Sequence, residues 1–144
     1  GAFAGAVLVW LHYMAHWSIT DNPASKLAIF WTAPAVRSTP ANLICEIIAT
    51  MVLVLAILFI GANEFTAGLN PLIVGALIVS IGLSLGGTTG FAINPARDIA
   101  PRIAHFLLPI PGKGGSDWAY SWIPIVGPLV GGVLGAWIYK ALFI

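Results

Sequence analysis

The chain has 144 residues, of which 59% are hydrophobic and only 8% are charged, and its net charge at pH 7 is +1. Soluble domains are about 45–50% apolar and about 25% charged, so this composition excludes a soluble globular fold and also intrinsic disorder. The few Lys and Arg residues form no basic face for nucleic acid, and the single cysteine, Cys45, excludes an intrachain disulfide and a cysteine-cluster metal site. What remains is an integral membrane protein, which we expect to be all-α.

The first part of the chain is predicted to contain one membrane helix and a long loop. A helix that spans a bilayer needs about 20 mostly apolar residues. Residues 1–17 carry no charge, and we expect a spanning helix there whose first residues lie before this sequence. Residues 18–40 contain three prolines and three charged side chains, which is typical of an external loop. Phe30 and Trp31 are expected to anchor this loop at the membrane interface.

Three further apolar runs are predicted to span the membrane. Residues 41–60 carry one charge, Glu46, and residues 69–86 carry none. The last run covers residues 121–144 and follows a polar loop at residues 109–120. Glycines at intervals of four on this last run form a ridge that favours close helix packing: Gly127, Gly131 and Gly135.

Residues 87–107 are too short and too charged to span the membrane. We expect a re-entrant loop that begins with the extended or turning residues 87–90, followed by a half-helix. Asn94 then takes the N-cap and Pro95 the first helical position, which are the preferred places for both residue types. The positive end of the half-helix would point to the membrane centre and repel cations and protons. The alternative is a surface helix with an ordinary Asn-Pro start.

The charged side chains of this segment separate into two groups. Arg97, one turn into the half-helix, would be a fixed cation facing a cavity, and an ionisable residue inside the membrane indicates a functional site. Asp98 and Arg102 are four residues apart and are expected to form a helix-supporting ion pair under either interpretation. His105 is expected at the exposed end of the half-helix.

Residues 90–98 read G-F-A-I-N-P-A-R-D and closely resemble the second signature of the major intrinsic proteins, the aquaporin and glycerol-facilitator family. The order of the predicted helices also resembles the second half of that family. The resemblance implies a single transmembrane channel domain over residues 1–144, an aquaporin-like helical bundle. Its second inverted repeat would be complete and its first mostly missing from this chain.

Several positions resemble the glycerol-conducting branch of the family. Gly82 stands where water-specific members place a histidine, and glycine leaves room for a carbon backbone. The resemblance implies a selectivity filter formed by Gly82, the aromatic Phe91 and the donor Arg97. The other residues that match this branch are Asp98, Arg102, Pro124 and Ile125.

The resemblance also assigns the pore lining. Glu46 would support the re-entrant loop by accepting hydrogen bonds from its backbone N–H groups, so that the loop carbonyls turn towards the pore. The residues implied in the pore itself are the motif Asn94, Pro95 and Ala96 and the carbonyls of Phe91, Ala92 and Ile93.

A second Asn-Pro-Ala sequence, residues 22–24, is interpreted as unrelated to the pore. It lies in the polar loop, between Asp21 and Ser25, and Asn94 follows Asn22 by 72 residues. That separation leaves room for one spanning helix and part of another, whereas the family places three between its two motifs. His12 and His16 have metal-ligand spacing without a third ligand, and we expect them at the membrane interface.

The predicted function is a passive channel for glycerol and other small neutral solutes, with water, that excludes ions and protons. The resemblance implies a homotetramer in the cell membrane; no enzyme activity, cofactor, metal or nucleic-acid partner is expected. Three alternatives stay open. One is an inverted-repeat secondary transporter, one is a channel for water, hydrogen peroxide, urea or small undissociated acids, and one is a half-size homodimer.

Overall fold

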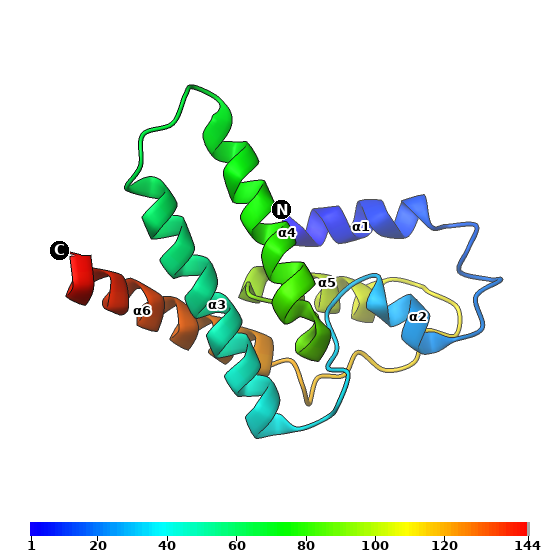
Figure 1. Ribbon diagram of the computed structural model, residues 1–144. Coiled ribbons are helices and arrows are strands. Elements are labelled where there is room, and N and C mark those ends of the chain that lie inside the picture. Colours follow the sequence, from blue (N-terminus) through cyan, green and yellow to red (C-terminus); the bar gives the residue numbers. More distant parts are fainter. Residues whose placement is uncertain (144) are drawn as a thin grey trace.

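The computed structural model describes residues 1–143, and these residues form helices and no strand, which confirms the all-α prediction (Figure 1). Three of the helices, α3, α4 and α6, are long and apolar enough to cross a membrane. In chain order the helices are α1 (Ala2–His12), α2 (Pro23–Ala28), α3 (Thr39–Gly61), α4 (Leu69–Thr89), α5 (Pro95–Leu107) and α6 (Ile123–Phe143).

The glycine ridge of α6 packs closely against a helix, as the sequence predicts, but its partner is α3 of the same repeat, whereas the resemblance implies a position between the two repeats. Helix α3 packs most extensively against α6 and also contacts α4; α6 crosses behind α3 in Figure 1. A Cβ atom added to Gly127 would lie 2.6 Å from the Cβ of Glu46, and one added to Gly135 would lie 2.7 Å from the Met51 carbonyl oxygen. Only glycine permits such a close approach. The ridge therefore holds Glu46 in the protein interior.

Helix α1 is shorter than predicted. It has 11 residues, about 16 Å at 1.5 Å per residue, and the prediction of one helix over residues 1–17 is wrong at its C-terminal end. Beyond His12 the chain forms turns, with His16 N–H bonded to the Tyr13 carbonyl at 2.8 Å. The indole N–H of Trp17 donates to the Trp10 carbonyl at 2.9 Å. It thereby satisfies a helix-end acceptor that continued helix would otherwise use.

Two other boundaries differ from the prediction. Helix α4 continues through residues 87–89, which were expected to be extended or turning, and it ends at Gly90 with φ +75°. The Gly90 N–H bonds to the Gly86 carbonyl at 2.9 Å, a common helix-ending arrangement. The predicted loop at residues 18–40 contains α2, which starts at Pro23 and is capped by the side chain of Asn22.

A small hydrophobic core lies among α1, α2 and α5, to the right of α3 and α6 in Figure 1. Trp31 is 1% exposed and Phe30 is 3% exposed, so the expectation that these residues anchor the loop at the membrane surface is wrong. His105 is fully buried, not exposed, because its ring packs against both aromatic rings, with centroids 4.8 and 5.4 Å away. The loop at residues 18–40 therefore folds down onto α5.

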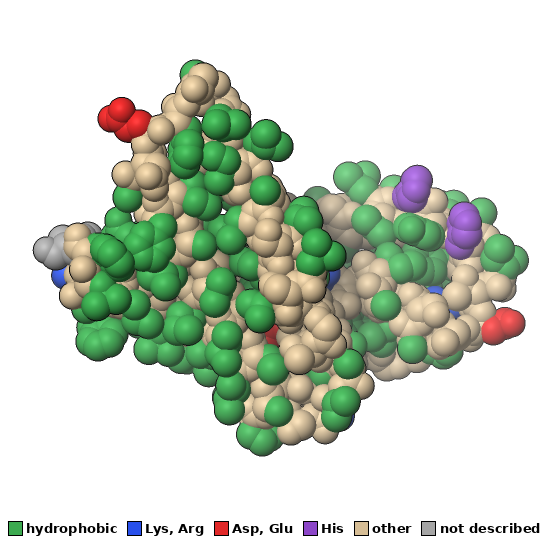
Figure 2. All heavy atoms as spheres, in the orientation of Figure 1, with side chains coloured by type: hydrophobic (Ala, Val, Ile, Leu, Met, Phe, Trp, Pro, Cys, Tyr) green, Lys and Arg blue, Asp and Glu red, His purple; other side chains and the backbone are tan. Residues whose placement is uncertain are grey.

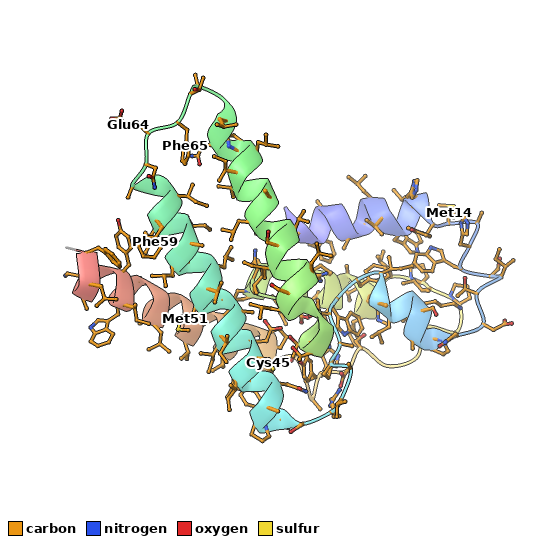
Figure 3. All side chains as sticks on the ribbon, in the orientation of Figure 1. Met14, Cys45, Met51, Phe59, Glu64 and Phe65 are labelled. Carbon is orange, nitrogen blue, oxygen red and sulfur yellow. The ribbon has the colours of Figure 1, made fainter. Side chains whose placement is uncertain are left out.

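Hydrophobic side chains cover the outer surfaces of the long helices (Figure 2). Leu72 and Leu83 on α4 and Val133 on α6 are among the most exposed apolar residues, which suits helices surrounded by lipid. The acidic side chain of Glu64 lies on the loop joining α3 to α4, beyond the helix ends (Figure 3). Glu64 thus lies away from the exposed apolar side chains of the long helices.

Candidate pore segment

The chain between α4 and α5 is non-helical and locally strained. Phe91 and Ile93 both have φ +43°, a left-handed conformation that is uncommon outside glycine and costly for a β-branched residue. Such conformations persist only where the surrounding structure imposes them, and they cluster at functional sites. The surrounding contacts must therefore hold this loop in place.

The carboxylate of Glu46 supplies those contacts. Its Oε1 accepts a hydrogen bond from the Thr89 hydroxyl at 2.6 Å and from the Ala92 N–H at 3.0 Å, and its Oε2 accepts from the Ile93 N–H at 2.9 Å. Glu46 is only 1% exposed. A buried charge is tolerated where it is fully hydrogen-bonded, and here both oxygens are used.

The same hydrogen bonds set the direction of two loop carbonyls. In a planar trans peptide the C=O and the following N–H point in opposite directions. Because the N–H groups of Ala92 and Ile93 point to Glu46, the carbonyls of Phe91 and Ala92 point away from it. This orientation agrees with the acceptor role predicted for these two carbonyls, whereas the direction of the Ile93 carbonyl stays a prediction.

Asn94 begins the half-helix in the predicted manner. Its Oδ1 accepts from the backbone N–H groups of Ala96 at 3.0 Å and Arg97 at 3.3 Å, and Pro95 takes the first helical turn. Since the oxygen is occupied by the helix N-terminus, the side-chain NH₂ is the group left to donate outwards. The half-helix ends at Leu107, as predicted.

Two open grooves share Asn94 and Arg97, and both side chains are exposed in this chain. One groove, of about 260 Å³, is also lined by Leu53, Ile78, Phe91, Ala92 and Ile93. The other, of about 370 Å³, is also lined by Ala2, Phe30, Ala96 and Pro101. The Nη1 of Arg97 lies 3.5 Å from the Phe30 carbonyl, which accepts a long hydrogen bond from it. Asn94 and Arg97 of the half-helix segment thus border both grooves, and loop residues Phe91, Ala92 and Ile93 line one of them.

The structure brings Gly82 and Phe91 together. A Cβ atom on Gly82 would lie 3.1 Å from the Phe91 ring, and one on Gly86 would lie 2.8 Å from it. The ring therefore lies against Gly82 and Gly86 of α4 and lines the same groove as Arg97. Of the other branch-matching residues, Pro124 is buried and Ile125 half-buried at the start of α6, and neither lines the two grooves.

Asp98 and Arg102 form the predicted ion pair, but in an environment that the sequence did not reveal. The Nη2 of Arg102 lies 2.8 Å from Asp98 Oδ1, and both side chains are fully buried. Trp31 and the residue pair Ser116 and Asp117 complete the surroundings of Arg102. The burial of Trp31 cannot be predicted from the residues around it in the sequence, because its partner Arg102 lies far away along the chain.

The outer loops are joined by further polar contacts. Arg37 forms two 2.6 Å hydrogen bonds with Asp117, which raise the pKa of the guanidinium above its usual value. Lys113 donates to three carbonyls near the end of α5, at 2.7 to 2.8 Å, and partial burial lowers the pKa of its amine. These contacts hold residues 109–120 over the C-terminal end of the half-helix, where a cation is favourable.

The Asn-Pro-Ala sequence at residues 22–24 lies apart from the grooves. A Cβ atom on Gly114 would lie 3.4 Å from Pro23, and Lys26 donates to the Pro111 carbonyl. Helix α2 is therefore docked on the outer loop at residues 111–114. His12 and His16 are exposed, and among residues 1–143 no three His, Cys, Asp or Glu side chains are grouped to hold a metal ion.

Long apolar helices and a capped half-helix beside a strained loop define an integral membrane protein that contains an interrupted helical segment. The chain belongs to the major intrinsic protein family, which it matches over residues 1–139.

Similar proteins support this assignment. The chain is 63% identical over 143 residues to the glycerol uptake facilitator protein of Bacillus subtilis, covering 99% of this chain and 52% of that protein. It is 64% identical to the probable glycerol uptake facilitator protein of Thermotoga maritima, covering 99% of this chain and 61% of that protein. The X-ray structure of the aquaglyceroporin from Plasmodium falciparum aligns with a TM-score of 0.82 at 29% identity, over 98% of this chain and 59% of that chain. The chain thus spans between half and two thirds of their lengths.

Proposed function

We propose that this chain supplies one side of a passive channel for glycerol and other small neutral solutes, with water. The observation that carries the proposal is the arrangement of polar groups around the two grooves that share Asn94 and Arg97. The Asn94 amide and the Arg97 guanidinium donate from the half-helix, and carbonyls held by Glu46 accept from the loop. Several weak contacts of this kind replace a solute's hydration without trapping it.

The groove suits a polyol better than water alone. A polyol has a hydroxyl edge and an apolar edge, and the Phe91 ring against Gly82 offers an apolar wall near the donors of Arg97. The relatives named as glycerol uptake facilitators support the same solute. The positive half-helix terminus and Arg97 would exclude cations and protons.

The proposed channel works in the cell membrane as a homotetramer in which each protomer has its own pore. The rest of each pore would come from sequence outside this chain, because the chain covers 52% of the Bacillus relative. The exposed apolar faces of α3, α4 and α6 are available for lipid and for neighbouring protomers. Chemical crosslinking of the full-length protein in membranes tests the tetramer, and a product no larger than a dimer would contradict it.

Tracer uptake tests whether transport is passive. Vesicles containing the full-length protein are given radiolabelled glycerol with and without an imposed proton or sodium gradient. We expect the internal concentration to rise only to the external one in both cases. Accumulation above the external concentration under a gradient would contradict the channel and favour an inverted-repeat secondary transporter.

A small-acid channel is the second candidate within the family. One observation favours it: the chain is 43% identical, over 99% of its length and 61% of the relative, to the D/L-lactic acid transporter of Lactiplantibacillus plantarum. Both solutes are small and hydroxylated, so the same groove could accept either. Comparing lactic acid and glycerol fluxes in the same vesicles at acidic pH decides which solute is preferred.

A further inference from the structure

Arg102 is the most completely hydrogen-bonded buried cation on the half-helix. Its Nε and Nη2 donate to Asp98 Oδ1 at 3.0 and 2.8 Å, and its Nη1 donates to the carbonyls of Ser116 and Asp117, each at 2.8 Å. The guanidinium carbon lies 4.4 Å from the centre of the Trp31 ring. The fixed fork and planar face of arginine are suited to such a combination, and lysine cannot reproduce it.

These contacts join three segments that lie far apart in the sequence. Asp98 belongs to α5, Trp31 to the loop between α2 and α3, and Ser116 to the loop before α6. We name Arg102, Asp98, Trp31 and the Ser116 and Asp117 carbonyls the buried arginine cluster. Because Arg102 and Asp98 are fully buried, breaking this cluster would leave unpaired charge in the interior, which is strongly unfavourable.

The cluster lies directly beside the filter residues. Asp98 follows Arg97 in the half-helix, and its Oδ2 accepts a 3.4 Å hydrogen bond from the Thr32 hydroxyl. The backbone of the same loop contacts Arg97 through the Phe30 carbonyl at 3.5 Å. Thr32 also lies against Gly90, where an added Cβ would be 3.0 Å from the Thr32 Cβ. The loop held by Arg102 therefore contacts both ends of the pore segment.

We propose that Arg102 is a positioning residue for the selectivity filter. By holding Asp98 and both outer loops in one buried cluster, it fixes the direction in which Arg97 presents its donors. The inference rests on the proposed channel function. A filter displaced by a fraction of an ångström loses its match to a polyol's hydroxyl groups, whereas water, which is smaller, still passes.

The test compares two charge-conserving substitutions in the full-length protein reconstituted into vesicles. Arg102→Lys keeps the charge but loses the fork contacts to the two loops. Lys140→Arg is the control, because Lys140 is an exposed cation near the end of α6, away from the buried arginine cluster. We expect the glycerol-to-water permeability ratio to fall about threefold or more in Arg102→Lys and to stay at the wild-type value in Lys140→Arg.

A ratio makes the readout independent of the amount of folded protein. If Arg102→Lys lowers glycerol and water permeability in proportion, or changes neither, Arg102 has only a structural role and the inference is wrong. If this variant does not fold, Trp31→Phe and Thr32→Val perturb the same contacts more mildly, and an unchanged ratio in both would equally contradict it. A wild type that conducts urea but not glycerol would contradict the proposed solute alone, and the urea-to-water ratio would then test Arg102.

Discussion

Glu46 is the residue on which the geometry of residues 90–94, the proposed pore loop, depends most directly. Its two carboxylate oxygens accept three hydrogen bonds, two of them from consecutive backbone N–H groups. One N–H group belongs to Ile93, which has φ +43°. The other belongs to Ala92, which lies between Ile93 and Phe91, the second residue with φ +43°. Without these hydrogen bonds the loop would relax to a more common conformation. The Glu46 carboxylate therefore holds the loop in its strained conformation.

Replacing Glu46 with Gln should impair both stability and conduction. An amide has one acceptor oxygen and an NH₂ group, so at least one loop N–H would face a donor and remain unpaired, at a cost of about 1–3 kcal/mol. We expect a lower thermal unfolding temperature in detergent and lower glycerol flux. Glu64→Gln, on the exposed loop between α3 and α4, is the control and should behave as wild type. Wild-type stability and flux in Glu46→Gln would refute the supporting role.

Gly82 sets the space beside the aromatic wall. Because an added Cβ would meet the Phe91 ring at 3.1 Å, Gly82→Ala should displace the ring slightly and Gly82→His should fill the space. We expect glycerol permeability to fall more than water permeability, progressively from Ala to His. Gly75→Ala, on the same helix with no atom within 4 Å of the new Cβ, should change neither. Equal loss of both permeabilities in Gly82→His would contradict the assignment of Gly82 to the filter.

At the scale of the elements, the crossing of α3 and α6 places Glu46 opposite the pore loop. The glycine ridge brings the backbones together at Gly127, Gly131 and Gly135, and the Cβ of Glu46 is itself one of the atoms in contact. The two helix backbones approach closely because the ridge glycines have no side chains to separate them. The ridge thus connects helix packing to the position of the loop.

Gly131→Ala should weaken this helix pair. An added Cβ on Gly131 would overlap the Ile47 carbonyl oxygen, and relieving such overpacking typically costs about 1–3 kcal/mol. We expect a lower unfolding temperature for the full-length protein. Gly132→Ala provides the matched control on the adjacent residue, since its Cβ would lie an ordinary 3.8 Å from Val54. If both variants unfold at the same temperature, the ridge is not the packing face.

Local sequence signals predicted some elements and missed others for physical reasons. The half-helix was predicted over Pro95–Leu107 because an Asn-Pro start is a strong local signal. The sequence does not locate the end of α4, because Gly87 and the two threonines that follow it resemble a turn, although the helix continues to Thr89 and ends at Gly90. The end of α1 depends on Trp17 bonding back to Trp10, a contact that hydropathy cannot reveal.

The same distinction applies to the candidate site. The role of Glu46 is implied by the family resemblance, and that of Arg97 by its place in the half-helix and by the same resemblance. The structure places both beside residues 91–93. The buried surroundings of Arg102 were missed, since Trp31 precedes it by 71 residues and Ser116 follows it by 14. Long-range packing of this kind leaves no periodic pattern, so it becomes visible only in the folded chain.

At the scale of the whole molecule, charge is scarce, and four of the eleven charged side chains lie where the proposed channel needs them. Of the charged side chains, Glu46 lies under the pore loop and Arg97, Asp98 and Arg102 lie on the half-helix. The remaining charges lie on loops, on α2 or near the end of α6. Burying charge in a bilayer is expensive and therefore indicates function, and this distribution is what a neutral-solute channel with a fixed positive filter requires.

Stopped-flow light scattering on vesicles containing the full-length protein tests the central claim most directly. Vesicles are mixed in separate experiments with an impermeant osmolyte, with glycerol and with urea. Their shrinkage and reswelling are compared with those of protein-free vesicles. The account predicts fast water-driven shrinkage, fast reswelling as glycerol enters down its gradient, and no added proton leak. Reswelling in glycerol no faster than in protein-free vesicles would contradict it.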